Sequence, residues 1–136
     1  MSYSSPRTIP EAISLVQNKP SFAFIAGGTD LMVRRSMGLD AAEHLVDISR
    51  IRELHGIVMK ADTVSIGATT TLAELATSPI ILSHLTALAQ AALSIASPPI
   101  RNSATVAGNL MCENRCIYYD QSEFWQTAAG GCQNSD

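Results

Sequence analysis

The chain has 136 residues, enough for one ordinary domain or for two small lobes that share a core. Hydrophobic residues make up 46% and charged residues 15%, a composition that excludes wholesale disorder. The net charge is −3 and no run of Lys or Arg occurs, so the sequence gives no sign of a basic surface that would bind nucleic acid. No apolar stretch is long enough to span a membrane. The N-terminus lacks the pattern of a signal peptide, so we expect a soluble, cytoplasmic protein.

Residues 1–56 predict a small α/β lobe. Residues 8–11 have the composition of a helix start, with Pro at a first-turn position. Residues 22–26 are a continuous apolar run, typical of a strand buried on both faces. A glycine turn and a short helix over 31–37 follow, and residues 44–48 predict a second buried strand. This alternation of helix and strand indicates a parallel sheet.

Residues 57–111 predict a second lobe of a different kind. Residues 57–66 have the pattern of a β-hairpin with a polar turn. Residues 71–74 fit a capping box at the start of a short helix, which Pro79 ends. The strongest helical pattern covers 84–96 and is closed by the Ser-Pro-Pro that follows.

The glycine turn is a candidate phosphate site. Gly27 and Gly28 come directly after a strand and before a helix, where glycine lets an anion approach successive N–H groups closely. The helix N-terminus adds partial positive charge, and Thr29 adds a hydroxyl donor. Asp30 would repel a phosphate, so we expect it to accept backbone N–H bonds at the helix start. A plain strand-to-helix turn is the alternative interpretation.

A second small-residue loop lies at 105–109. Its small side chains would permit close approach of a planar or phosphate-bearing ligand, and Asn109 can donate and accept hydrogen bonds. A tight bend between packed elements is the alternative. Two such segments in one small chain favour a nucleotide cofactor lying between two lobes.

The cysteines Cys112, Cys116 and Cys132 are odd in number and confined to the last quarter of the chain. This clustering favours metal or redox chemistry, with ordinary buried thiols as the alternative. Cys112 and Cys116 have the spacing of half a zinc site, but three cysteines complete neither a four-cysteine zinc site nor a four-cysteine cluster. The histidines and glutamates form no site by spacing, so we assign no catalytic residue.

Three segments, at 26–31, 66–74 and 100–110, together resemble the FAD-binding subunit of the molybdenum hydroxylases, a family that includes xanthine and carbon monoxide dehydrogenases. The resemblance runs from about residue 6 to the end. The resemblance implies an α+β fold of two lobes with FAD between them. It also implies that two segments of the chain contact the pyrophosphate of FAD. Those segments are Ile25, Ala26, Gly27, Gly28, Thr29, Asp30 and Leu31 in the first lobe, and Thr105, Val106, Ala107, Gly108 and Asn109 in the second. It also implies a [2Fe–2S] subunit and a molybdopterin subunit as partners.

The C-terminal residues carry a finer resemblance, to the β subunit of 4-hydroxybenzoyl-CoA reductase, through residues 114–125 and Cys132. That branch has an inserted loop that binds a [4Fe–4S] cluster, and Cys116 and Cys132 match its first two ligands. The resemblance implies that electrons pass from the cluster through FAD to molybdenum, with ferredoxin as a candidate electron partner. Residues 112–136 would be the start of this loop, in a chain that looks truncated before the other two ligands.

Two alternatives stay open. The chain could be an FAD subunit of the xanthine or carbon monoxide dehydrogenase type, which passes electrons outward from molybdenum. It could also be a truncated, non-catalytic remnant that binds no cofactor. One departure from the family pattern is Ala107, where the family usually has a second glycine.

Overall fold

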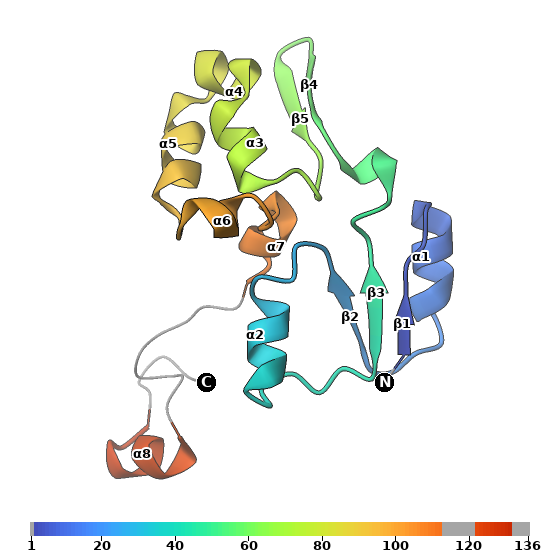
Figure 1. The fold of residues 1–136 in the computed structure, drawn as a ribbon, viewed down its shortest axis with the longest axis vertical. Helices are drawn as coiled ribbons and strands as arrows, with labels where there is room; N and C mark the ends of the chain where they lie inside the picture. Colours follow the sequence, from blue (N-terminus) through green and yellow to red (C-terminus); the bar gives the residue numbers. More distant parts are fainter. Residues whose placement is uncertain (1, 113–121, 132–136) are drawn as a thin grey trace.

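The computed structural model describes residues 2–112 and 122–131, which form a small parallel sheet with its helices, a hairpin with a group of helices, and a C-terminal helix (Figure 1). The elements in chain order are β1 (Ser2–Ser4), α1 (Ile9–Val16), β2 (Phe22–Ile25), α2 (Leu31–Ser36), β3 (His44–Asp47), the 3₁₀ turn η1 (Arg52–Leu54), β4 (Ile57–Lys60), β5 (Thr63–Ile66), α3 (Leu72–Thr77), α4 (Pro79–His84), α5 (Thr86–Ser94), α6 (Pro98–Arg101), α7 (Val106–Leu110) and α8 (Glu123–Ala128).

The first sheet is parallel throughout, as the sequence predicts, and has the order β1-β3-β2. Its central strand pairs on both sides, so that His44 lies opposite Ser2 of β1 and opposite Phe22 of β2. The sequence does not predict β1, because its Ser-Tyr-Ser residues form no apolar run. Pairing with β3, rather than local pattern, makes it a strand.

Helix α1 begins as predicted and covers the central strand of this sheet. The Thr8 hydroxyl accepts a hydrogen bond from the Glu11 N–H at 3.3 Å, and the Glu11 carboxylate accepts one from the Arg7 N–H at 2.8 Å. These reciprocal bonds satisfy N–H groups that a helix start leaves without partners. The buried core of this lobe consists of Ala12, Val46 and Ile51.

The prediction that the strand at 22–26 is buried on both faces is wrong. Phe22 and Phe24 are 39% and 47% exposed, and their rings meet edge to face with centroids 5.4 Å apart. The strand β2 lies at the edge of a three-stranded sheet, and the buried core of this lobe lies over β3 instead. Only a central strand of so small a sheet is enclosed by its neighbours.

The second group of elements starts with the predicted hairpin, in which β4 and β5 pair antiparallel from Ile57 and Ile66 to Lys60 and Thr63. Helices α3, α4 and α5 pack together beside it (Figure 1). Val64 and Ile66 of β5 pack against their core. That core consists of Leu72, Leu75, Ala76, Ile81, Ala89 and Ala92.

The helix predicted over 84–96 is present as α5, which is shorter by two residues at each end. His84 ends α4, and Leu85, with φ −137° and ψ 49°, interrupts the helical path before α5 begins. Pro79 ends α3 as predicted, but it also starts α4, because its fixed φ and missing N–H suit a first helical turn. In the same way, Pro98 and Pro99 open α6 after closing α5.

The C-terminal helix α8 starts at Ser122, whose hydroxyl accepts a hydrogen bond from the Trp125 N–H at 3.3 Å. The predicted cluster ligands Cys116 and Cys132 lie outside the described residues. No helix in the described part of the chain is long and apolar enough to cross a membrane.

Candidate cofactor cleft

A cleft of about 420 Å³ brings the two predicted segments together. All of residues 25–31 line it, and so do Thr105, Gly108 and Asn109 of the second segment. Val106 and Ala107 do not line it: Val106 packs against the hydrophobic core of α3 to α5. Segments almost 80 residues apart in the sequence therefore face one space, as a ligand bound between two lobes requires.

Gly27 sets the distance between the two sides of this cleft. A Cβ atom at this position would lie 1.8 Å from the Ser103 carbonyl oxygen, far inside contact distance. The absent side chain thus allows the turn after β2 to pack directly on the backbone that leads into α7. Gly28 is needed for its backbone conformation. Its φ of +68° lies in the left-handed region, which glycine adopts without strain.

The glycine turn also presents backbone donors to the cleft. The N–H groups of Gly27, Gly28 and Thr29 donate to no acceptor among the described residues, and all three residues line the cleft. Gly28 and Thr29 are half-buried and Gly27 is exposed, so a ligand or water can reach these groups. Successive N–H groups of this kind suit an anion such as a phosphate.

Asp30 does not cap helix α2 as predicted. It occupies the N-cap position, but its side chain makes no capping hydrogen bond. Its backbone has φ −107° and ψ −57°, whereas a side chain reaches back to the helix N–H groups from an extended N-cap residue. Asp30 is the only charged residue that lines the cleft in the described part of the chain.

The second segment is a helix start and not the predicted loop. Thr105 is the N-cap of α7, and its hydroxyl accepts a hydrogen bond from the Gly108 N–H at 3.2 Å. The N–H groups of Val106 and Ala107 donate to backbone carbonyls of the 68–70 loop at 2.8 and 3.1 Å. The backbone N–H groups of residues 106–109 therefore already donate within the protein.

The capping box that the sequence predicts forms directly after the 68–70 loop, at the start of α3. The Glu74 carboxylate accepts hydrogen bonds from the Thr71 N–H and hydroxyl at 2.9 and 2.8 Å, and it pairs with His55 at 3.3 Å. Partial burial raises the pKa of Glu74, but the bonds from Thr71 and the nearby His55 outweigh it and hold this pKa below its usual value. Glu74 thus stabilises the start of α3, in the role that the predicted capping box gives it.

Other lining residues could not be predicted from sequence. Phe24, Ile95, Ile100 and Met111 give the cleft an apolar wall, together with Ala96 and the half-buried thiol of Cys112. Ile100 and Met111 are 41% and 82% exposed, which is unusual for large apolar side chains beside a polar turn. Their shared position depends on the path of α5 to α7, which the sequence pattern does not reveal.

The described residues form no group of three or more His, Cys, Asp or Glu side chains that could hold a metal ion. Cys112 is a free, half-buried cysteine in this part of the chain. The assignment of Cys116 and Cys132 as cluster ligands stays a prediction.

Comparison with known proteins gives a consistent result. A family model described as the FAD binding domain in molybdopterin dehydrogenase matches residues 1–124. The chain is 41% identical over 110 residues to the xanthine dehydrogenase FAD-binding subunit of Escherichia coli, a match that covers 80% of this chain and 38% of that protein. It is 40% identical over 109 residues to the carbon monoxide dehydrogenase medium chain of Hydrogenophaga pseudoflava, covering 79% and 38%.

A solved structure of the carbon monoxide dehydrogenase from Hydrogenophaga pseudoflava matches with a TM-score of 0.78 at 39% identity and covers 81% of this chain and 39% of the matched one. This likeness confirms the mixed α+β fold that the sequence predicts. The chain spans less than two-fifths of the length of the curated relatives it matches. On the family match and these relatives, the chain belongs to the family of FAD-binding domains of the molybdopterin dehydrogenases.

Proposed function

We propose that this chain is the FAD-binding part of an electron-transfer subunit in a molybdenum-containing oxidoreductase. The observation that carries the proposal is the cleft in which the glycine turn at 25–31 faces Thr105, Gly108 and Asn109. The named relatives, which are FAD-binding or medium subunits of xanthine and carbon monoxide dehydrogenases, agree with it.

The residues of the cleft fit the cofactor. The donors at Gly27, Gly28 and Thr29 would hold the pyrophosphate, because they lack partners in the described protein and no Lys or Arg lines the cleft there. The apolar wall, which includes Ile95 and Ile100, would face the ring systems of the cofactor. Asn109 would supply a polar contact at the far side.

Bound FAD would supply one- and two-electron transfer, which no amino-acid side chain of this chain provides. The chain itself would bind and orient the cofactor and exclude water from one side of it. We assign no acid–base catalyst, because electron transfer through a flavin needs none from this chain. The partners would be a [2Fe–2S] subunit and a molybdopterin subunit, as in the expectation from sequence.

For the finer assignment we propose a subunit of the 4-hydroxybenzoyl-CoA reductase type, in which electrons reach FAD through a [4Fe–4S] cluster and leave toward molybdenum. The motif around Cys116 and Cys132 in the sequence supports it. The chain holds two of the four cysteine ligands that such a cluster needs, so the remaining two would have to come from outside this sequence. A xanthine or carbon monoxide dehydrogenase type, with outward electron flow, is the second candidate, favoured by the names of the relatives.

Flavin retention tests the main proposal. The chain is purified without oxygen, incubated with FAD and passed through gel filtration, and the flavin absorption that stays with the protein is measured. We expect retention in the wild type and in Gly38→Ala, and loss in Gly28→Ala. Both glycines have positive φ, +74° and +68°, so the two variants carry the same backbone strain, but only Gly28 lines the cleft. Absence of flavin from the wild type would contradict the proposal and favour the alternative of a non-catalytic chain that binds no cofactor.

Electron paramagnetic resonance separates the two finer assignments. The complex is purified anaerobically with its partner subunits and reduced. A [4Fe–4S] signal that disappears in Cys116→Ser supports the reductase type. Signals from [2Fe–2S] clusters alone, unchanged in Cys116→Ser, support the dehydrogenase type.

A further inference from the structure

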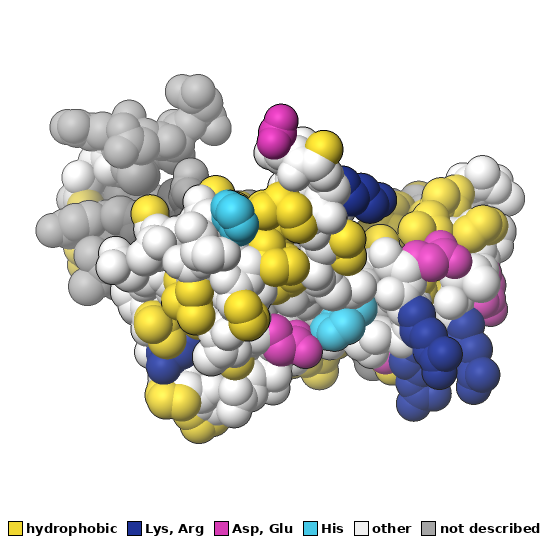
Figure 2. Space-filling model, turned by 90° about the horizontal axis from the view of Figure 1, so that it is seen from above, with side chains coloured by type: hydrophobic (Ala, Val, Ile, Leu, Met, Phe, Trp, Pro, Cys, Tyr) yellow, Lys and Arg dark blue, Asp and Glu magenta, His cyan; other side chains and the backbone are white. Residues whose placement is uncertain are grey.

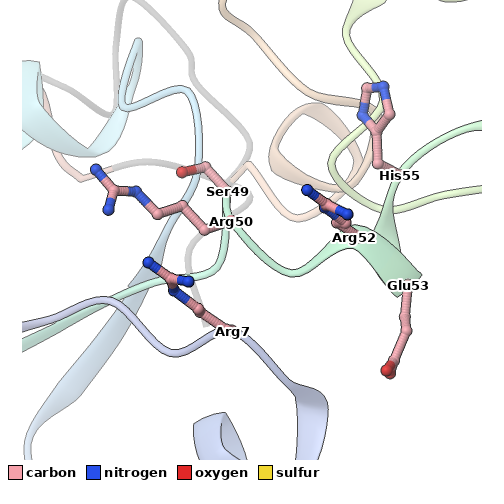
Figure 3. Close-up of a pocket in the computed structure, with 6 residues that line it drawn as sticks. All are labelled: Arg7, Ser49, Arg50, Arg52, Glu53 and His55. Atoms are coloured by element: carbon pink, nitrogen blue, oxygen red, sulfur yellow. The ribbon is translucent and has the colours of Figure 1, made fainter.

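We infer that a second cleft, separate from the flavin cleft, binds a small anion that carries a phosphate or diphosphate group. This arginine cleft has a volume of about 920 Å³ and is lined by Arg7, Ser49, Arg50, Arg52, Glu53 and His55 (Figure 3). No residue is common to its lining and to that of the flavin cleft. The inference goes beyond the proposed function and does not depend on it.

The arginine cleft concentrates positive charge in an acidic protein. The chain has nine Lys and Arg residues and a net charge of −3, yet three of the nine line this one cleft. Figure 2 shows the largest group of Lys and Arg side chains at one end of the molecule, with others elsewhere on the same face. Like charges that line one cleft repel each other, and a bound anion offsets this repulsion, so such a cluster favours a counter-ion.

The guanidinium groups of the three arginines form no ion pair within the described residues. None of the Arg7, Arg50 and Arg52 guanidinium groups forms a side-chain hydrogen bond there either. The nearby carboxylate of Glu11 is directed to the backbone N–H of Arg7, at 2.8 Å, and not to its guanidinium group. The cluster is therefore left with donors that an external anion can use.

Asp47, a further acid close to this cleft besides Glu11 and Glu53, is engaged elsewhere. Its carboxylate accepts hydrogen bonds from the Tyr3 hydroxyl at 2.5 Å and from the Ser49 N–H at 2.9 Å. Partial burial raises the pKa of Asp47, but these bonds and the charge of Arg50 outweigh it and hold the pKa below its usual value. Asp47 is thus ionised, and its contacts fix the turn that carries Ser49 and Arg50.

The orientation of the side chains suits a tetrahedral anion. Arg7 and Arg50 extend to the same side, toward which the Ser49 hydroxyl also points, and Glu53 points away from them (Figure 3). Guanidinium groups bind phosphate oxygens in pairs of parallel hydrogen bonds. The cleft follows the carboxyl ends of β1 and β3, the edge of a parallel sheet at which ligands commonly bind.

The number of charges selects the class of anion. A monocarboxylate would neutralise one of the three arginines, whereas a phosphate monoester or a diphosphate carries charge enough for two or three. The Ser49 hydroxyl adds a neutral donor for a further oxygen. We therefore assign the cleft to a phosphate-bearing small molecule and not to a carboxylate substrate.

Isothermal titration calorimetry with inorganic pyrophosphate tests the assignment on the full chain, with and without FAD. We expect saturable binding in both states, with the arginine cleft as the site that remains when FAD occupies the flavin cleft. Arg7→Gln and Arg50→Gln should each weaken it about tenfold or more, because each removes a charged donor pair. Flavin retention should be unchanged in both variants, since neither residue lines the flavin cleft.

Lys60→Gln is the matched control, because it removes the same charge from the far end of the hairpin, where Lys60 is exposed. It should leave the affinity for pyrophosphate unchanged. Equal weakening by Lys60→Gln, or no saturable binding in the wild type, would overturn the assignment. So would binding of a glutamate-rich peptide without binding of pyrophosphate, which would make the cleft a protein-binding surface.

Discussion

The glycine turn at 25–31 and the small-residue segment at 105–109 are alike in sequence but differ in structure. Both contain small residues, and both line the same cleft. The turn leaves the N–H groups of Gly27, Gly28 and Thr29 without partners among the described residues. In the second segment, the N–H groups of residues 106–109 donate to Thr105 and to the 68–70 loop. The turn can therefore bind an anion directly, whereas the segment forms a rigid wall opposite it.

The two regions also depend on each other. Gly27 packs on the carbonyl of Ser103, so the position of the turn is set by the backbone that leads into α7. The N–H groups of Gly27, Gly28 and Thr29 have no partners within the described protein. They keep their positions because the turn packs against the backbone before α7. Each prediction below disturbs one side of this arrangement and leaves the other intact.

The largest effect is expected for Gly27→Ala. The new Cβ would lie 1.8 Å from the Ser103 carbonyl oxygen, and a backbone atom cannot move away without shifting α7. We expect a loss of about 1–3 kcal/mol in the free energy of unfolding and complete loss of bound flavin. Urea denaturation and gel filtration with FAD measure the two. Retention of flavin in this variant would show that the contact does not set the cleft.

Thr105→Val should lower the free energy of unfolding by removing the N-cap of α7. It keeps the shape of the side chain but removes the hydroxyl that accepts the Gly108 N–H, at a site only 6% exposed. Loss of a helix N-cap costs about 1 kcal/mol in the free energy of unfolding. Thr105→Ser restores the acceptor and should recover most of this loss. Equal stability of Thr105→Val and the wild type would mean that the cap does not hold α7.

Glu74→Gln should alter the pH dependence of stability. The pKa of Glu74 is lower in the folded state than its ordinary value of 4.5, so its contribution is complete above that value and is lost as the pH falls through the folded-state pKa. Thermal melts from about pH 6 to about pH 3 should show a smaller loss for Glu74→Gln than for the wild type. Identical curves would contradict this role.

The smallest effect is expected for Thr29→Val on the turn. It removes one hydroxyl donor from the cleft and leaves the backbone donors unchanged. We expect the dissociation constant of FAD to rise about fivefold, as for one hydrogen bond, with stability within about 0.5 kcal/mol of the wild type. Fluorescence titration of FAD measures it. A change in stability with no change in affinity would place the hydroxyl outside the flavin contact.

Features that depend on neighbouring residues could be predicted from sequence. The caps at Thr8 and Thr71 are examples, because donor and acceptor lie three residues apart along the chain. The glycine turn is another, since strand, two glycines and helix follow each other directly. Features made by distant pairing could not be predicted: β1 is a strand through its bonds to β3, and the break at Leu85 has no local signal.

The candidate site divides in the same way. The glycine turn is a local pattern, so its place in the cleft could be anticipated. The role of 105–109 could not, because its N–H groups bind carbonyls of residues 68–70, more than 30 positions away. The apolar wall with Ile95, Ile100 and Met111 exists only after α5, α6 and α7 have folded into place.

The central position of β3 has a consequence for the order in which the protein is assembled. The outer strands β1 and β2 both pair with β3, so neither gains its main-chain partner until residues 44–47 have left the ribosome. The glycine turn follows β2 and is fixed by Ser103, which is synthesised later still. During synthesis the chain therefore carries two unmatched strand edges and an unformed cofactor turn, and this interval is when it is most open to mispairing.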